Sequence, residues 1–470
     1  MRKLLLLICL VNLTSNFNAQ TYPSLNINLL AHLNPETDVT GTDGRKYSGC
    51  WGWAQTNKNR EYAIVGTSSQ TYFVDVTNPS SPVVVDSVKA KHAGCTWREM
   101  KTYQNYCYIV SDDAPPNTFQ IVDMQYLPDS VHVIHNGTTY FERSHTIFID
   151  NDKMYCGSVT EASGAGYSTM RVYSLATPTA PVLIRKLEQD VNTTIIDVVH
   201  DMYVRNDTIY ASCGFKGFHI LKLTASNTFS LMQSYTGYAY SGYNHSSWQT
   251  DDRKTMVFAD EVGAHLPAKV IDVTNFNNIT LVDTIRSSYT ATAHNPYIVG
   301  NRWCWLSSYQ DGLYLYDISN PSNTTIYGYF DTQPQTGTTN YSGNWGAYPY
   351  LPSKIIIACD MQNGIFILEG DNTYKGSVGI GEQASQSSMF SVYPNPAKDE
   401  IHFLIANQSH KNIQCTITDV LGKIVYREEL NIDDAFYKTT IHTSALNNGC
   451  YFVTLKGNNL NETKKILIQK

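Results

Sequence analysis

One short phrase recurs seven times in the chain, and it limits the fold to few architectures. Each copy begins with an aromatic residue or a histidine, continues with two variable residues and usually ends on a large apolar residue. The copies begin at Trp51, Trp97, His145, His200, His245, His294 and Trp345. They are about 45 to 55 residues apart, which is the length of a β-propeller blade rather than of a helical solenoid repeat. The recurrence therefore predicts seven blades around one axis.

The residues between the phrases read as short strands. Runs such as 106–110 and 208–212 are rich in β-branched and aromatic residues and are bounded by turn residues. A third and a fourth strand follow in most repeats, and four strands per repeat make a propeller blade. The seventh repeat lacks an obvious fourth strand, whereas residues 26–31 precede the first repeat as an orphan strand. We predict an all-β, seven-bladed propeller that this N-terminal strand closes, because an open blade would expose an unpaired edge.

The third strands often end in a turn with its own chemistry. Asp75-Val-Thr-Asn-Pro79 and Asp317-Ile-Ser-Asn-Pro321 are near copies, in which polar side chains bond local backbone and proline stops the strand. With His200-Asp-Met-Tyr-Val204 and Tyr309-Gln-Asp-Gly-Leu313, these turns resemble the LVIVD-repeat proteins of the choice-of-anchor B family. The resemblance covers roughly residues 24–370 and implies a secreted propeller in 20–370, but it supplies no established catalytic residues. Repeat three departs from it with Ser174-Leu175.

The N-terminus reads as a secretory signal peptide over residues 1–19. Arg2 and Lys3 precede eight apolar residues, too few to span a bilayer. We therefore expect an exported, soluble mature chain without a transmembrane segment. The net charge of −7 is mild, and the sequence has no basic stripe. Both observations argue against nucleic acid as a partner.

The C-terminal part has a separate signature after a polar linker at 371–388. Residues 389–470 read as a small β-sandwich of about seven strands. They resemble a type A sorting domain of the type IX secretion system, and the residues that carry the resemblance are Tyr393, Pro394, Asn395, Pro396, Gly422, Gly449, Tyr451 and Lys465. The resemblance implies that the secretion machinery is a partner. It also implies removal of the tail, with the mature protein anchored at the outer cell surface or released.

Four consecutive phrases begin with histidine, at 145, 200, 245 and 294, and this is the only constellation that suggests chemistry. In a propeller these histidines point to one mouth of the channel, where the second strands also end. Those strand ends supply Asp112, Asp113, Asp260, Glu261, Asp311 and Asp360. The candidate set for a divalent metal or another ligand is His145, His200, His245, His294, Asp260, Asp311 and Asp360.

A structural role for these histidines is the competing interpretation. Tryptophan takes the same position in the other three repeats, so packing is a shared use of the position, and an imidazole can bond a neighbouring blade's backbone. The four histidines reach one ion only if the channel is narrow. We favour a secreted or surface binding protein, whose ligand is a surface protein or glycan. The alternative is a secreted metal-dependent hydrolase or lyase, although no nucleophile, base and orienting group can be named together.

The cysteines give one further expectation. Cys107, Cys156, Cys213, Cys304 and Cys359 fall in or at the ends of second strands, where buried thiols pack well. Cys50 and Cys95 instead precede the phrase in neighbouring repeats, and for these two a disulfide remains an alternative to free thiols.

Overall fold

The computed structural model describes residues 22–113, 115–162, 165–334, 341–376, 390–393, 397–406, 412–431, 436–457 and 461–470. The chain forms two compact units that divide between Gly376 and Ser377. The predicted signal peptide, residues 1–19, lies outside the described residues. The prediction of an all-β chain is confirmed.

Seven antiparallel sheets make up the described part of the first unit, and the strands of each follow one another from the innermost outwards. The first two are β3 Tyr47–Gln55, β4 Arg60–Thr67, β5 Gln70–Asp75, β6 Val83–Lys89, and β7 Arg98–Tyr103, β8 Tyr106–Ser111, β9 Phe119–Asp123, β10 His132–Gly137. The third and fourth are β11 Arg143–Asp150, β12 Lys153–Thr160, β13 Tyr167–Ser174, β14 Val182–Lys186, and β15 Asp201–Arg205, β16 Thr208–Ser212, β17 Phe218–Leu223, β18 Phe229–Tyr235.

The remaining three sheets follow the same order. The fifth is β19 Tyr243–Gln249, β20 Thr255–Val262, β21 Ala268–Asp272, β22 Thr280–Ile285. The sixth is β23 Pro296–Val299, β24 Trp303–Ser307, β25 Leu313–Asp317, β26 Thr325–Phe330, β1 Ser24–Leu25, and the seventh is β27 Asn344–Tyr348, β28 Ile355–Asp360, β29 Gly364–Gly370, β2 Ile27–Leu33. Short helices are η1 Thr56–Lys58, η3 Leu187–Gln189, η4 Phe276–Asn278 and α1 Asn372–Lys375.

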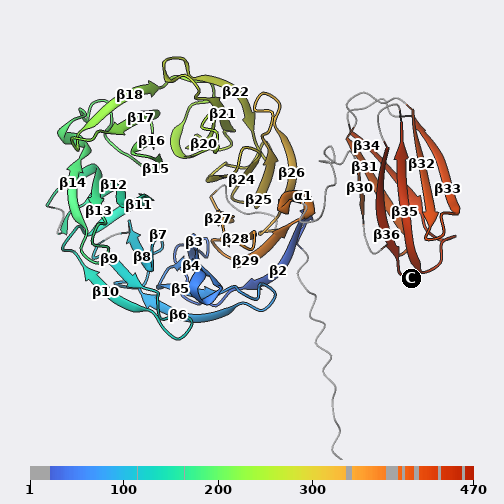
Figure 1. The fold of residues 1–470 in the computed structure, drawn as a ribbon, viewed down its shortest axis with the longest axis horizontal. Helices are drawn as coiled ribbons and strands as arrows, with labels where there is room; N and C mark the ends of the chain where they lie inside the picture. The colour runs from blue at the N-terminus through green and yellow to red at the C-terminus, as the bar shows by residue number, and fades with distance from the viewer. Residues whose placement is uncertain are drawn as a thin grey trace, which may run out of the picture. The chain divides into compact units, whose positions relative to one another are not determined.

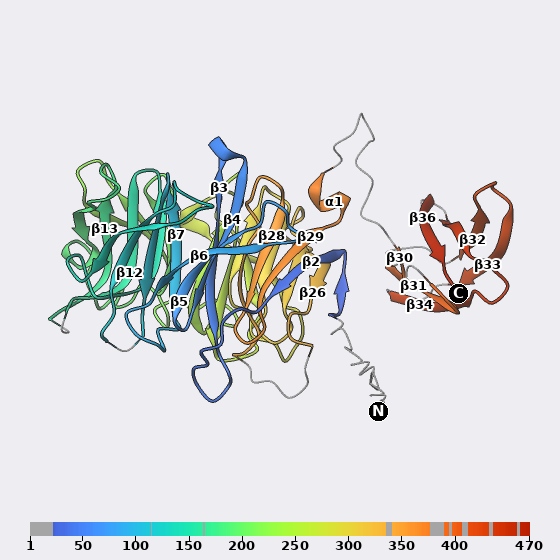
Figure 2. The same ribbon diagram turned by 90° about the horizontal axis from the view of Figure 1, so that it is seen from below.

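The sheets are arranged in a ring with their first strands toward the middle (Figure 1). The strand β3 lies against β7, and the contacts continue through β11, β15, β19 and β23, while β27 lies against both β24 and β3. Figure 2 shows the inner strands running along the axis of this ring. The loops that lead into each innermost strand therefore share one edge of the ring with the ends of the second strands.

The N-terminal strands join two sheets. The strand β2 pairs with β29, with Ile27 opposite Gly370 and Leu33 opposite Ile365, while β1 pairs with β26. Between them Asn26 adopts a positive φ of 55° and donates from Nδ2 to the carbonyl of Tyr327. Residues 24–33 thus span the sixth and seventh sheets, and no other strand lies at the outer edge of β29 among the described residues.

The core of the first unit lies between neighbouring sheets. For example, Val65 and Val74 of the first sheet pack with Ile357 and Ile367 of the seventh. The five cysteines predicted as buried thiols are all free and buried. Every sheet therefore depends on its neighbours for burial of its apolar faces.

Cys50 and Cys95 do not form a disulfide. The Cys50 thiol faces the carbonyl of Ile357, whereas the Cys95 thiol donates to Asn117 Oδ1 at 3.1 Å. Each cysteine is buried against a different neighbour, so the alternative of a disulfide is not realised.

The predicted turn chemistry is present after the third strands. Asp75 Oδ1 accepts from the backbone N–H of Thr77 at 2.9 Å, and Asp317 Oδ1 accepts from that of Ser319 at 3.0 Å. In repeat three Ser174 replaces the aspartate, and its hydroxyl accepts from the N–H of Ala176 at 3.2 Å. The local hydrogen bond is therefore kept where the sequence departs from the pattern.

The second unit consists of two sheets around one core. The sheets are β30 Phe390–Tyr393, β31 Glu400–Ala406, β34 Phe436–His442, and β33 Ile424–Asn431, β32 Asn412–Asp419, β35 Gly449–Lys456, β36 Asn461–Ile468. Ile401 and Phe403 of the first sheet share a buried cluster with Ile417, Val453 and other residues of the second. This arrangement agrees with the β-sandwich that the alternating strands predict.

The segment predicted as a linker begins with ordered structure. Asp371 caps α1 by accepting from the N–H of Tyr374, whose ring is buried against Trp305. Residues 377–388 lie outside the described residues. No helix in the described parts of the chain has the length and apolar character needed to cross a bilayer.

Candidate functional site: a histidine cluster at the channel mouth

The first residues of six phrases gather around one mouth of the ring. The ring centroids of His145 and His200 are 4.0 Å apart, those of His200 and His245 are 4.4 Å apart, and those of His245 and His294 are 4.3 Å apart. Trp345 continues the series 4.4 Å from His294 and stacks on Trp97 at 4.9 Å. The channel is therefore narrow enough for the four histidines to be direct neighbours.

The seventh phrase residue takes a different place. Trp51 lies against Tyr348 with centroids 4.7 Å apart, and the Lys101 ammonium lies 4.2 Å from the Trp51 centroid. A common position in the repeat therefore does not give all seven side chains one environment.

Irregular pairing directs these side chains into the channel. The register of β19 with β20 shifts between Asn244 and Ser246, so His245 is left unpaired, and β27 shifts in the same way around Trp345. His200 and His294 precede the first paired residues of β15 and β23. Bulges of this kind re-aim a side chain at the end of a strand.

Two of the imidazoles are anchored by backbone of the next sheet. His200 Nδ1 lies 3.2 Å from the carbonyl oxygen of His245, and His294 Nδ1 lies 2.5 Å from that of Trp345. A carbonyl oxygen only accepts hydrogen bonds, so Nδ1 carries the proton in both residues. The Nε2 atom of each neutral ring is then left with its lone pair. His200 and His294 thus bond the backbone of a neighbouring sheet, as the structural interpretation of the histidines predicts. The same hydrogen bonds leave Nε2 of each ring able to bind a ligand.

The pKa values of the four histidines are shifted in different directions. Burial lowers the pKa of His294 to about 4 and holds those of His200 and His245 well below the usual value, with further lowering of the latter two by neighbouring histidines. Burial also opposes protonation of His145, but the hydrogen bond between its Nδ1 and Asp112 Oδ2, at 2.8 Å, and the charges of Asp112, Asp201 and Glu99 together outweigh burial and raise the His145 pKa. Three neutral imidazoles therefore lie beside one that favours protonation.

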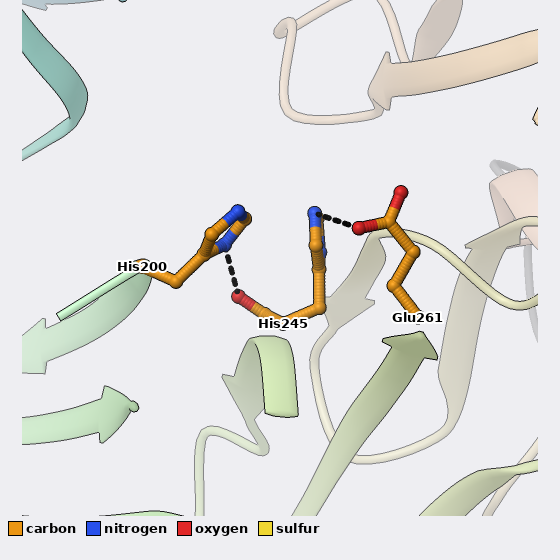
Figure 3. Close-up of side chains that lie close together, drawn as sticks. All are labelled: His200, His245 and Glu261. Carbon is orange, nitrogen blue, oxygen red and sulfur yellow. Dashed lines mark hydrogen bonds and ion pairs between the residues drawn. The ribbon is translucent and has the colours of Figure 1, made fainter. Parts of the chain in front are cut away.

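Glu261 is the acid that lies beside His245 and His294. It lies near the end of β20, opposite the bulge at His245, with Oε2 3.6 Å from His245 Nε2 and Oε1 4.0 Å from His294 Nε2. The Tyr309 hydroxyl donates to Oε1 at 2.5 Å. Figure 3 shows the His200 and His245 rings side by side with the Glu261 carboxylate next to His245.

The three acids chosen from the sequence lie elsewhere. Asp260 forms a fully buried ion pair with Lys269 and accepts from the Tyr238 hydroxyl at 2.8 Å. Asp360 accepts from the Thr332 hydroxyl at 2.6 Å, and Asp311 lies in the turn that joins β24 to β25. Adjacent residues of a strand face opposite sides, so Glu261 faces the channel where Asp260 does not. Sequence reasoning placed Glu261 at this rim but left it out of the ligand set.

The cavity below the histidines is small and partly lined by aromatic side chains. It has a volume of about 50 Å³ and is also lined by Phe148, Trp248 and Tyr297. Lys101, Glu99 and Asp201 also line this cavity, and Lys101 Nζ lies 3.1 Å from the Glu99 carboxylate. Burial is the main cause that raises the pKa of Asp201 to about 6, and the charge of Glu99 adds to it. Organic ligands usually occupy 300–1,000 Å³, so this cavity suits a few waters or one ion.

Exposed aromatic residues surround the same mouth. Among the described residues six aromatic side chains are exposed, and five of them lie at the edge where the innermost strands begin: Tyr167, Phe215, Tyr240, Tyr289 and Tyr341. The sixth is Tyr126, which follows β9 at the opposite edge.

Two of these exposed residues connect to the histidine cluster through intermediate rings. Phe215 lies 5.1 Å from Tyr243, which lies 5.2 Å from His200. Tyr341 lies 5.7 Å from Tyr309, and Tyr309 lies 4.5 Å from His294. The exposed aromatic surface and the buried histidines are therefore parts of one face.

The depressed pKa of His294 predicts a specific loss of stability in acid. Because the folded pKa of about 4 lies below the unfolded value near 6.5, the unfolded chain binds more protons between them. The stability is present above about pH 6.5 and is lost as the pH falls through about 4, by about 3 kcal/mol for this one group. Guanidinium unfolding at pH 7 and 4 should show that wild type loses this much more than His294→Gln. A substitution at exposed His132 serves as the control and should follow wild type; equal losses in all three proteins would contradict the assignment.

The residues of the predicted sorting signal fall in the second unit where the structure describes them. Tyr393 ends β30, Gly422 adopts a φ of 81° in the turn before β33, and Gly449 begins β35. Tyr451 is buried and its hydroxyl donates to the carbonyl of Asn447 at 3.0 Å, while Lys465 lies on β36. Pro394, Asn395 and Pro396 lie outside the described residues.

The ring of antiparallel sheets, with the phrase residues of successive repeats at one mouth, defines a propeller-like, all-β class of protein. Comparison with known families agrees with this class. The chain matches the LVIVD repeat at residues 61–90 and 308–332 and the secretion system C-terminal sorting domain at residues 391–469. Both LVIVD segments contain the Asp-containing turns described above. The chain thus carries LVIVD repeats and a type IX sorting domain, and this tail indicates secretion by that system.

Similarity to solved structures is one of fold. The WD40 β-propeller domain of Doa1 matches over 74% of this chain and 98% of that domain, with 10% identity and a TM-score of 0.50. PorZ, an essential bacterial surface component of the type IX secretion system of Porphyromonas gingivalis, matches over 92% of this chain, with 10% identity and a TM-score of 0.49. The match covers 61% of PorZ. No curated protein matches the chain.

Proposed function

We propose that this chain is a secreted or cell-surface binding protein of the choice-of-anchor B type, whose first unit is a seven-bladed propeller closed by β2. In this proposal, the signal peptide at 1–19 directs export and the tail at 389–470 engages the type IX machinery before its removal. The pairing of β2 with β29 supports the closure, because it adds a fourth strand to the last sheet.

The observation that carries the binding role is the set of exposed aromatic residues around the histidine mouth. Tyr289 is 83% exposed and Phe215 is 75% exposed, although burial of such side chains is favourable. Aromatic residues are enriched where proteins bind partners, because they offer large contact areas at low entropic cost. The channel cavity of about 50 Å³ is smaller than the 300–1,000 Å³ that organic ligands usually occupy, and in this proposal a macromolecular or glycan ligand contacts the outer face instead.

Binding to arrays of bacterial surface glycans and surface proteins tests the proposal. We expect the wild-type chain to bind one of these two classes, and Phe215→Ser and Tyr289→Ser each to weaken binding by about tenfold or more, since buried aromatic anchors contribute about 2 kcal/mol or more. Tyr126→Ser at the opposite edge is the matched control and should bind as wild type. Absence of binding to both arrays, or equal loss in all three variants, would contradict a binding role for this face.

A further inference from the structure

We propose that His200, His245 and Glu261 bind one divalent metal ion at the channel mouth, and that Zn²⁺ is the ion their donor set fits best. The site is independent of the ligand-binding role proposed above, because it needs only these side chains and their immediate supports. Within the described residues, this is the one set of three histidine, cysteine or acidic side chains whose ligand atoms could share an ion.

The spacing of the ligand atoms carries the first step. One ligand atom from each residue lies within 4.8 Å of the other two, and His245 Nε2 is 3.6 Å from Glu261 Oε2. Ligands that bind Zn²⁺ tetrahedrally at about 2.0–2.2 Å lie about 3.3 Å from one another. Small side-chain rotations would therefore close the set around an ion. Figure 3 shows the two imidazoles side by side and the Glu261 carboxylate next to the His245 ring.

The hydrogen bonds behind the ligands carry the second step. The Nδ1–H of His200 donates to the carbonyl of His245, which leaves Nε2 unprotonated toward the mouth. Tyr309 donates to Glu261 Oε1, which leaves Oε2 free beside His245. Metal-binding imidazoles and carboxylates commonly have such supports, which fix the tautomer and the orientation of each ligand.

A buried nitrogen without a partner carries the third step. His294 has no exposed side-chain surface, its Nε2 makes no hydrogen bond in the described structure, and it lies 4.0 Å from Glu261 Oε1. A buried polar atom left unpaired costs free energy unless a ligand or water meets it. We assign His294 as the fourth ligand or as the partner of a water on the ion.

The chemistry of the donors selects the metal. Two imidazole nitrogens and one carboxylate suit Zn²⁺, whereas Ca²⁺ and Mg²⁺ prefer sites made of oxygen atoms. His145 does not belong to this set of three residues. The small cavity beside the histidines leaves room for a water on the ion.

Zinc binding to the full-length chain tests the site. After removal of metals with EDTA, we expect titration with ZnCl₂ to give one Zn²⁺ per chain by calorimetry and elemental analysis, with a rise in the midpoint of thermal unfolding. Co²⁺ in place of Zn²⁺ should give visible absorption bands of a low-coordinate nitrogen and oxygen site. Absence of binding to wild type at millimolar ZnCl₂ would overturn the proposal.

Matched variants locate the ion. Glu261→Gln and His245→Gln should weaken Zn²⁺ binding at least about 100-fold, and Tyr309→Phe about 10-fold or more, since loss of a supporting hydrogen bond usually costs 10- to 100-fold. The control His132→Gln removes an exposed histidine of β10 and should bind as wild type. The thermal midpoint of each metal-free variant shows that it is folded, and Tyr309→Phe keeps the test valid if a ligand variant does not fold. Unchanged affinity in folded Glu261→Gln or in Tyr309→Phe would overturn this ligand set.

Discussion

Deletion of residues 24–33 is expected to abolish cooperative folding of the first unit or to lower its free energy of unfolding by more than about 5 kcal/mol. The deletion removes β2 from the edge of β29 and β1 from β26. It also uncovers the cluster in which Ile27 packs with Phe366 and Leu368, and each large apolar side chain that loses its burial costs about 1.5–3 kcal/mol. Losses of this size equal much of the stability of an ordinary domain.

Tryptophan fluorescence in guanidinium measures this effect selectively. All seven tryptophans lie between Trp51 and Trp345, within the first unit. Two point variants within β2 test whether burial of this strand, and not merely its presence, stabilises the unit. Ile27→Ala, at a 1% exposed position, should lower the free energy of unfolding by about 2–5 kcal/mol. Leu29→Ala, at a 39% exposed position, should lower it much less. If the deleted chain unfolds at the same guanidinium concentration as wild type, β2 does not close the ring.

Replacement of Lys269 by methionine should destabilise the first unit by about 3–5 kcal/mol. Lys269 Nζ and Asp260 Oδ2 form an ion pair between β21 and β20 in which both side chains are 0% exposed. Without the ammonium, the Asp260 carboxylate would be a buried charge whose remaining contacts are hydrogen bonds from neutral groups such as the Tyr238 hydroxyl. Removing one partner of a buried pair is costly for this reason.

Two further variants make the test specific to charge. Asp260→Asn/Lys269→Met removes both charges while the Asn oxygen can still accept from Tyr238, so the double variant should recover most of the loss. Lys254→Met, at an exposed position just before β20, should stay within about 0.5 kcal/mol of wild type. A single variant as stable as wild type, or a double variant no better than the single one, would show that the pair is not a stabilising unit.

The buried pair also explains why the ligand set chosen from the sequence differs from the observed one. Asp260 and Glu261 are adjacent at the end of β20, and both belong to the acids expected at the rim. Strand alternation sends their side chains to opposite faces, but the sequence does not say which face meets the channel. The unpaired His245 opposite Glu261 decides it, since the bulge there sets the register of β19 with β20.

The sequence also left undecided whether the four histidines lie close enough together to reach one ion. From the sequence, four imidazoles on a seven-fold ring could reach one ion only in a narrow channel. The centroid separations of 4.0–4.4 Å between neighbouring histidines make the channel narrow. That width depends on how closely seven sheets pack, which is a property of all their apolar faces together.

Local sequence patterns were enough to predict the parts of this protein that depend on residues close together in the chain. The repeated phrase, the strand alternation and the Asp-containing turns specify the sheets, and the tail carries its own sorting signature, because each is encoded within a few tens of residues. The packing of the whole ring was needed to show that Glu261 rather than Asp260 lies beside the histidines, that Cys50 and Cys95 stay apart, and that Ser24–Leu25 pair with β26. These outcomes join residues from different sheets, so they depend on the radius and register of the ring and not on any local pattern.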